Sequence, residues 1–217
     1  MFGVFAALSM TFGNVAALVQ TNVKRMLGYS SIAQAGNIAI RLAAVAVTGA
    51  TGPSAVLFFL GTYVATNLGA FIAVLAISQR IGSDEISDYA GLMRRSPVLA
   101  TIFSISLLSL TGIPLTAGFV AKLYVFNSAV QANEQWLIAL IAIAVVNTAI
   151  SAFYYLRLVR TMVLDEPADE TRFNASYATQ GVLVIAAIAV VVLGVIPSPL
   201  ISAAQRSAES LILFTGG

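Results

Sequence analysis

The chain has 217 residues, of which 59% are hydrophobic and only 9% are charged. A soluble domain carries about 25% charged residues, so this composition excludes a soluble globule and predicts an integral membrane protein. The net charge of +2 excludes a strongly basic surface for nucleic acid. The absence of Cys and His excludes thiolate iron–sulfur ligation, histidine haem ligation, zinc sites built from either residue, and histidine-dependent triads.

Long uncharged runs predict about six membrane-spanning helices, because a span needs roughly 20 apolar residues. The fourth run is too long for one straight helix and contains TGIPLT in its middle, so we expect a discontinuous helix there. Pro197 ends the sixth run, and we expect a short amphipathic helix at the membrane interface over residues 201–217. The runs cover residues 2–20, 26–47, 54–78, 98–130, 136–155 and 177–196.

Cations gather on one side of this predicted topology. Eight Lys and Arg residues fall on one side of the membrane, and only Arg206 falls on the other. By the positive-inside rule, the eight lie in the cytoplasm and both chain termini lie on the non-cytoplasmic side. All nine Asp and Glu residues fall in loops or tails, so the predicted spans contain no acid. The eight cations are Lys24, Arg25, Arg80, Arg94, Arg95, Arg157, Arg160 and Arg172.

The predicted helix break lies just before Lys122. Proline removes a backbone donor and clashes with the preceding turn, while glycine permits a bend. Such breaks are tolerated in membrane helices where the freed backbone groups face protein or a water-filled cavity, and they recur at the midplane of transporters. The residues assigned to the break are Thr111, Gly112, Ile113 and Pro114.

Two cations remain inside the spans, Arg41 and Lys122. Arg41 falls near the outer end of its helix, where it reaches the lipid headgroups or makes a buried polar contact. Lys122 has no acid in its own helix, and desolvation beside a break disfavours its charged form. We therefore expect Lys122 to take up and release a proton near neutral pH. The alternative is a proline kink that serves packing only, with Lys122 extending to an interface.

Other polar residues inside the spans suggest a hydrated or hydrogen-bonded path. Each one by itself fits an ordinary helix–helix contact equally well. No phosphate-binding glycine loop and no metal motif accompanies them, so we expect this chain to bind no cofactor and no metal. The predicted polar axis comprises Ser31, Gln34, Asn37, Thr116, Tyr124, Asn147 and Tyr154.

Four segments, in order and at matching spacing, resemble the antiporter-like subunits of proton-pumping NADH:quinone oxidoreductase (respiratory complex I), in particular its N subunit. The final helix matches that family only by position. Subunits of multisubunit cation/proton antiporters and of membrane-bound hydrogenases share some of these elements and are near alternatives. The segments are GNVAALVQTNVKRMLGYSSIAQAG (13–36), DYAGLMRRSP (88–97), SLTGIPLTAGFVAKLYVF (109–126) and NTAISAFYYLRLVR (147–160).

The resemblance implies an all-α membrane fold. Residues 1–163 would form the second antiporter-like five-helix repeat, and residues 164–217 a loop, the last transmembrane helix and a C-terminal tail. In this family the Lys after GIP-x-x-x-GF carries protons, which places that role on Lys122. The chain itself would bind no redox group, because NADH, flavin, iron–sulfur clusters and quinone belong to partner subunits. The expected surroundings are other complex I membrane subunits and the lipid bilayer of a bacterial inner membrane, with no nucleic acid.

Two departures from the family pattern qualify these expectations. The family commonly has His in YSSISH, whereas this chain has Gln34, so a proton-carrying role at that position is lost or passed to bonded water. The first repeat of the family, with its membrane Glu and two further Lys residues, is missing from this sequence. We therefore expect the C-terminal half of an N-type subunit, accompanied by a separate N-terminal half or cut from a longer one. The remaining alternative is a structural fragment that does not conduct.

Overall fold

The computed structural model describes residues 1–48, 52–131 and 134–215, nearly all of them helical. This arrangement confirms the expected all-α class. A 3-10 turn at Ile86–Tyr89 precedes the shortest of the helices. The described helices are α1 (Phe2–Leu18), α2 (Val23–Thr48), α3 (Gly52–Ile81), α4 (Leu92–Arg95), α5 (Pro97–Thr111), α6 (Ala117–Gln131), α7 (Gln135–Leu164), α8 (Tyr177–Val195) and α9 (Ser198–Thr215).

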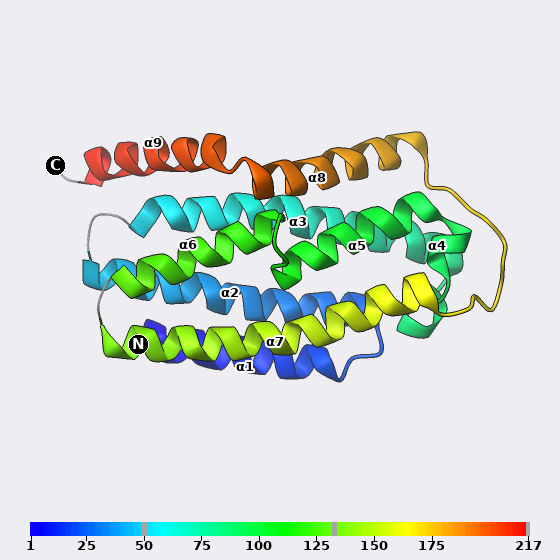
Figure 1. Ribbon diagram of the computed structural model, residues 1–217, viewed down its shortest axis with the longest axis horizontal. Coiled ribbons are helices and arrows are strands. Elements are labelled where there is room, and N and C mark those ends of the chain that lie inside the picture. The colour runs from blue at the N-terminus through cyan, green and yellow to red at the C-terminus, as the bar shows by residue number, and fades with distance from the viewer. Residues whose placement is uncertain (49–51, 132–133, 216–217) are drawn as a thin grey trace.

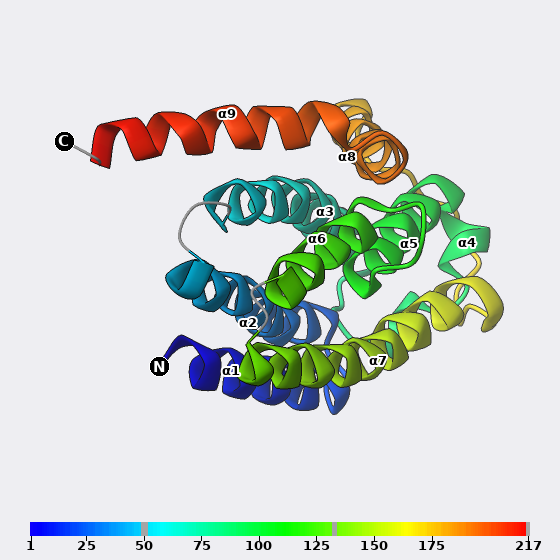
Figure 2. The same ribbon diagram turned by 60° about the vertical axis from the view of Figure 1, so that its left-hand side comes forward.

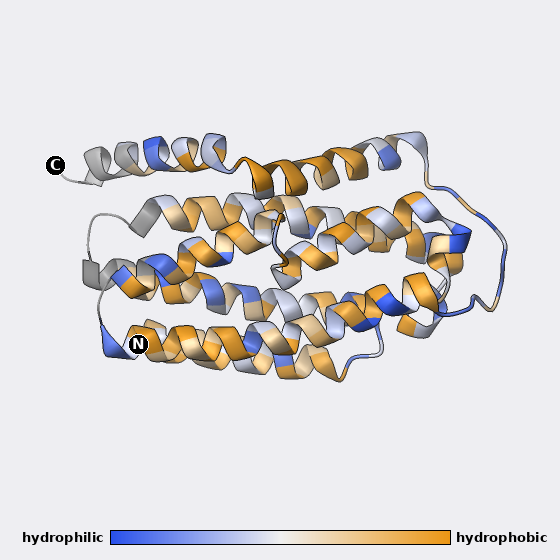
Figure 3. Ribbon diagram, in the orientation of Figure 1, coloured by the Kyte–Doolittle hydropathy of each residue, from blue (hydrophilic) through white to orange (hydrophobic). Residues whose placement is uncertain are grey.

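The helices follow the apolar runs of the sequence. Among the described residues, three helices are long and apolar enough to cross a membrane: Ser54–Ile81, Gln135–Leu164 and Tyr177–Val195. α1 and α5 are apolar but shorter. Figure 3 shows the predominance of hydrophobic residues along most of the bundle and hydrophilic residues at the end that carries α4. The count of six spans stays a prediction.

The longer helices lie side by side along the long axis of the molecule, with α3 near the centre (Figure 1). α1 packs against α2 and α7, while α3 contacts α2, α5, α6, α8 and α9. Figure 2 shows α8 and α9 on one side of α3 and α1, α2 and α7 on the other. The connection between α5 and α6 lies about midway along the bundle, with Thr116 buried and Leu115 exposed.

Buried apolar side chains form two clusters at different levels of the bundle. The first cluster includes Leu27, Val74 and Leu158. The second includes Ile40 and Phe58. Along each of the helices that contribute to both, the residues between the two clusters include buried polar side chains. We call these side chains, together with the buried Lys122 of α6, the polar layer: Asn14 on α1, Ser30, Gln34 and Asn37 on α2, Thr62 and Thr66 on α3, Asn147 and Ser151 on α7, and Lys122.

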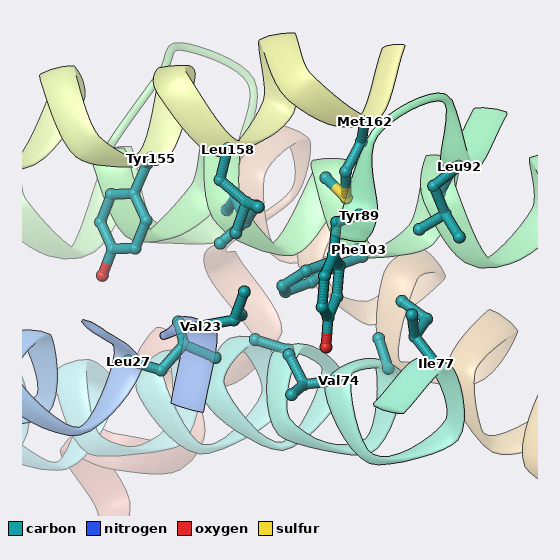
Figure 4. Close-up of a cluster of buried hydrophobic side chains, with 14 of the residues drawn as sticks. Val23, Leu27, Val74, Ile77, Tyr89, Leu92, Phe103, Tyr155, Leu158 and Met162 are labelled. Atoms are coloured by element: carbon teal, nitrogen blue, oxygen red, sulfur yellow. The ribbon is translucent and has the colours of Figure 1, made fainter. Parts of the chain in front are cut away.

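The first cluster packs side chains from several helices and from the segment before α4 against one another, among them Tyr89, Phe103 and Met162 (Figure 4). The rings of Tyr89 and Phe103 lie 6.4 Å apart between centroids. Burial raises the pKa of the Tyr89 hydroxyl. Nearby, the Lys24 ammonium lies 2.8 Å from the Asp84 carboxylate and donates to the Ser78 hydroxyl at 3.0 Å. Hydrogen bonding from Lys24, followed by bonding to Ser78, lowers the pKa of Asp84. These contacts fix the loop between α3 and α4 to the start of α2.

The C-terminal segment joins the bundle. The helix expected over residues 201–217 begins earlier, at Ser198, and it lies along α3. Residues 216–217 are outside the described part of the chain. α8 also contacts α3, α5 and α6, so the segment after residue 163 packs against the preceding helices. The division at residue 163 and the position of α9 relative to a membrane stay predictions.

Candidate functional site

The fourth apolar run is divided into two helices by residues 112–116. α5 ends at Thr111 because Gly112 takes a left-handed conformation, with φ of 91°, and its N–H donates to the carbonyls of Leu108 and Ser109. This is an ordinary glycine cap. Pro114 follows and has no N–H with which to continue the helix. The residues expected to break the run therefore end α5 in the structure.

α6 restarts alongside the end of α5. The Thr116 hydroxyl donates to the Ile113 carbonyl at 2.6 Å and closes the turn. The Gly118 N–H donates to the Ser109 hydroxyl at 3.1 Å. A Cβ atom at Gly118 would lie 1.8 Å from the Ser109 carbonyl oxygen, so only glycine permits this approach. The two helix ends overlap and do not stack end to end.

Lys122 folds back from α6 to the C-terminal end of α5. Its ammonium donates to the Thr111 carbonyl at 2.7 Å and to the Leu110 carbonyl at 3.2 Å, and the residue is 7% exposed. These carbonyls belong to the last turn of α5, where the helix dipole places partial negative charge. Its Cδ and Nζ would lie 3.0 and 3.3 Å from a Cβ atom at Gly112, so the glycine leaves room for the Lys122 chain. Helix-end carbonyls thus stabilise the cation where an acid would otherwise be needed.

A small cavity adjoins this ammonium. It has a volume of about 20 Å³, which suits one water molecule. Gln34 lies on its wall and donates to the Leu110 carbonyl at 3.2 Å, so Gln34 and Lys122 share one acceptor. Asn37 in turn donates to the Gln34 side-chain oxygen at 3.1 Å. The polar lining of the cavity consists of Gln34, Thr62, Tyr63, Thr66, Ser109 and Lys122.

Thr66 is a member of the site that the predicted polar axis lacks. Its hydroxyl donates to the Thr62 carbonyl at 2.9 Å and lies 3.2 Å from the Ser109 hydroxyl. The single Thr66 hydroxyl proton is already donated to Thr62, so Ser109 is the donor in its contact with Thr66. This chain of bonds fastens both sides of the break to α3. The available signal was spacing, since Thr62 and Thr66 share one helix face.

The predicted polar axis separates into groups. Gln34, Asn37 and Thr116 lie around the break. Asn147 and Tyr154 instead join Asn14: the Asn14 amide donates to the Asn147 side chain at 3.0 Å, and the Tyr154 hydroxyl donates to Asn14 at 2.9 Å.

The two remaining members of the axis, Ser31 and Tyr124, belong to neither group. The Ser31 hydroxyl donates to the Leu27 carbonyl of its own helix at 2.9 Å. The Arg41 guanidinium donates to the Tyr124 carbonyl and lies 5.8 Å over the Tyr124 ring. Arg41 is 2% exposed, so of the two alternatives for this residue, a reach to headgroups or a buried polar contact, the structure shows the buried polar contact. The cause is α6, which packs against α2 and offers the carbonyl and the ring.

Among the described residues, no group of three or more His, Cys, Asp or Glu side chains lies close enough to hold a metal ion. The Thr111 and Leu110 carbonyls accept from Lys122, and the Thr111 hydroxyl donates to the Leu107 carbonyl. The arrangement as a whole supplies one protonatable amine, two fixed acceptors and a cavity of water size.

Several known proteins are similar in sequence to this chain. The family model "NADH:quinone oxidoreductase/Mrp antiporter, TM" matches residues 1–151. The chain is 45% identical over 211 residues to "NADH-quinone oxidoreductase subunit N" of Dehalococcoides mccartyi, covering 96% of this chain and 43% of that protein. It is 43% identical over 213 residues to the protein of the same name from Desulforamulus reducens, covering 98% of this chain and 43% of that protein. The chain thus spans less than half the length of these relatives.

Solved structures share its fold. A chain of respiratory complex I from Thermus thermophilus matches with a TM-score of 0.79 at 33% identity, covering 93% of this chain and 44% of that chain. A chain of the Mrp complex from Dietzia sp. matches with a TM-score of 0.83 at 22% identity, covering 95% of this chain and 46% of that chain, and this likeness shows the fold alone. The expected family is confirmed: the chain belongs to the NADH:quinone oxidoreductase/Mrp antiporter membrane family.

Proposed function

We propose that this chain is the second antiporter-like repeat of an N-type membrane subunit in a proton-pumping NADH:quinone oxidoreductase. Lys122 is its proton carrier. The names of the most similar relatives support the subunit assignment. One geometric observation supports the role of Lys122: its ammonium rests on two helix-end carbonyls beside a cavity of water size.

The hydrogen-bond count of the amine explains how Lys122 exchanges a proton without leaving its site. An ammonium has three N–H donors and a neutral amine has two. The Leu110 and Thr111 carbonyls accept two of them in either state. The third position faces the cavity side of the site and carries the proton that is exchanged. Gln34 keeps the Leu110 carbonyl in place throughout.

The driving force comes from outside this chain. The sequence has no acid within its apolar runs, so no carboxylate within them attracts or repels the Lys122 proton. We assign that task to the first repeat expected for an N-type subunit and to other membrane subunits of the complex. NADH, flavin, iron–sulfur clusters and quinone belong to partner subunits, and this chain carries no redox centre. The unequal distribution of cations supports a bacterial inner-membrane location with both termini on the non-cytoplasmic side.

A subunit of a multisubunit cation/proton antiporter is the second candidate. The family description, which joins the two kinds of complex, and the shared fold with the Mrp complex favour it. A sodium antiporter requires Na⁺ for proton movement, and an NADH-driven pump does not. Proton movement that stops when Na⁺ is removed would favour the antiporter.

The test replaces Lys122 in the assembled complex in vesicles and measures protons moved per NADH oxidised. A positioned proton-transfer group contributes roughly 10²- to 10⁴-fold to rate, so Lys122→Ala should slow proton transfer through this chain by at least about 100-fold and lower the number of protons moved per NADH oxidised. Lys122→Arg should also fail, because guanidinium does not release its proton in this range. Lys24→Ala, which removes a Lys from the charged end, is the matched control and should pump normally. Normal pumping by Lys122→Ala would exclude Lys122 as the carrier.

A further inference from the structure

α8 ends against the helix break. It stops at Val195, before Pro197 and Pro199, neither of which has an N–H to continue the helix. Figure 1 shows this end of α8 next to the connection between α5 and α6, about midway along the bundle. α8 contacts both of those helices. The chain is therefore interrupted twice at neighbouring places.

Gly194 makes the contact between α8 and the break. A Cβ atom there would lie 2.4 Å from the Leu115 carbonyl oxygen and 2.5 Å from the Thr116 carbonyl carbon. Both are backbone atoms, so no side-chain rotation could relieve the clash. A single methyl group at Gly194 would force α8 and the break apart. Gly181, on the same helix, has open space where its Cβ would lie.

The backbone touched by Gly194 is strained. Leu115 has φ of 72°, and it is the only described non-glycine residue with positive φ. L-residues with a branched side chain rarely adopt this conformation, and it persists only where the surroundings enforce it. The Leu115 side chain is 70% exposed, so it does not supply that constraint. The Thr116 bond to Ile113 and the backbone contact with Gly194 do.

The other side of the same five-residue connection faces Lys122. Gly112 lies against the Lys122 chain, and Thr116 leads directly into α6, which carries Lys122. A shift of the Leu115–Thr116 backbone away from α8 thus moves the start of α6 relative to the end of α5. Such a shift would lengthen the hydrogen bonds of 2.7 and 3.2 Å from the Lys122 ammonium to the Thr111 and Leu110 carbonyls.

We propose that Gly194 is a positioning residue for Lys122: α8 holds the break in its strained form, and this keeps the ammonium on the α5 carbonyls. The proposal rests on the proton-carrying function of Lys122 argued above. It gives α8 a role in proton transfer, although none of its residues touches the proton.

The test compares Gly194→Ala with Gly181→Ala in the assembled complex in vesicles. The readouts are the amount of assembled complex, NADH oxidation, and protons moved per electron. We expect Gly194→Ala to lower protons per electron in the complexes that assemble, because a misplacement of about 1 Å can slow positioned chemistry by about 100-fold. Gly181→Ala should match the unsubstituted complex. A packing role alone would lower the amount of complex and leave protons per electron unchanged, which would overturn the proposal.

A second variant covers failure of assembly. Adding Leu115→Gly lets the backbone at the break move away from a methyl group at position 194 without strain. We expect this double variant to regain assembly and part of the pumping lost by Gly194→Ala. No recovery of either would overturn the proposal. Loss of pumping in Lys122→Ala together with normal pumping in Gly194→Ala would refute the role of Gly194 and leave the proposed function intact.

Discussion

Lys122→Met separates a proton-carrying role of Lys122 from a structural one. Burying an ammonium costs several kcal/mol, and each of its two charge-assisted hydrogen bonds returns about 1.5–3 kcal/mol, so the terms nearly cancel. Met keeps a long unbranched chain and has no charge to desolvate. It leaves the Thr111 carbonyl without this donor, at about 1–3 kcal/mol, whereas the Leu110 carbonyl keeps Gln34.

The expected change in unfolding free energy is therefore within about 2 kcal/mol of zero, or about 4–8 °C in Tm for a chain of this size. Proton movement should be lost all the same. Thermal unfolding of the full chain in detergent, followed by circular dichroism, measures the first quantity, and pumping by the complex in vesicles measures the second. Leu123→Met is the matched control at the neighbouring, exposed residue. A fall in Tm of more than about 10 °C, or retained pumping, would refute the reasoning.

Two further substitutions test the packing and the charged end. Gly118→Ala should destabilise the chain by at least about 2 kcal/mol, because its methyl group would overlap the Ser109 carbonyl. The control is Gly28→Ala, in open space on α2, which should raise stability by about 0.5–1 kcal/mol. Thermal unfolding measures both effects, and equal effects would count against the overlap. Because Lys24 lowers the pKa of Asp84 from 3.8, their ion pair stabilises the chain above about pH 3.8 and is lost as pH falls through the lowered value. Asp84→Asn should remove roughly 0.2–1 kcal/mol at pH 7 and make acid unfolding below about pH 3.8 less steep. An unchanged acid transition would contradict this.

The break and its Lys were predictable because their causes are local. Pro114 has no N–H with which to continue a helix, and Gly112 permits the left-handed conformation of a helix cap. Lys122 follows within a few residues, so chain connectivity keeps it close to that helix end. The partner of Arg41 was not predictable in the same way. Its position in the sequence fits a headgroup contact, and only the packing of α6 on α2 brings the Tyr124 carbonyl to it.

The predicted polar axis shows the same division. Composition indicates that polar residues occur inside the spans, but not which of them meet. Asn14 and Tyr154 are bonded across 140 positions of the chain, a pairing that depends on α1 lying beside α7. Thr66 was overlooked because a Thr in an apolar helix is commonly bonded to its own backbone, as it is here, and its contact with Ser109 depends on α3 lying beside α5.

The sequence by itself determined the membrane character, the helical runs, the place of the break and the one Lys beside it. Those properties follow from hydropathy, charge and backbone chemistry, which act over a few neighbouring residues. The tertiary structure alone decided that the Lys122 ammonium rests on two carbonyls of α5, that a polar layer separates two apolar clusters, and that Gly194 touches the strained backbone at Leu115. Such contacts join helices distant in the chain, and their distances are set by how whole helices pack.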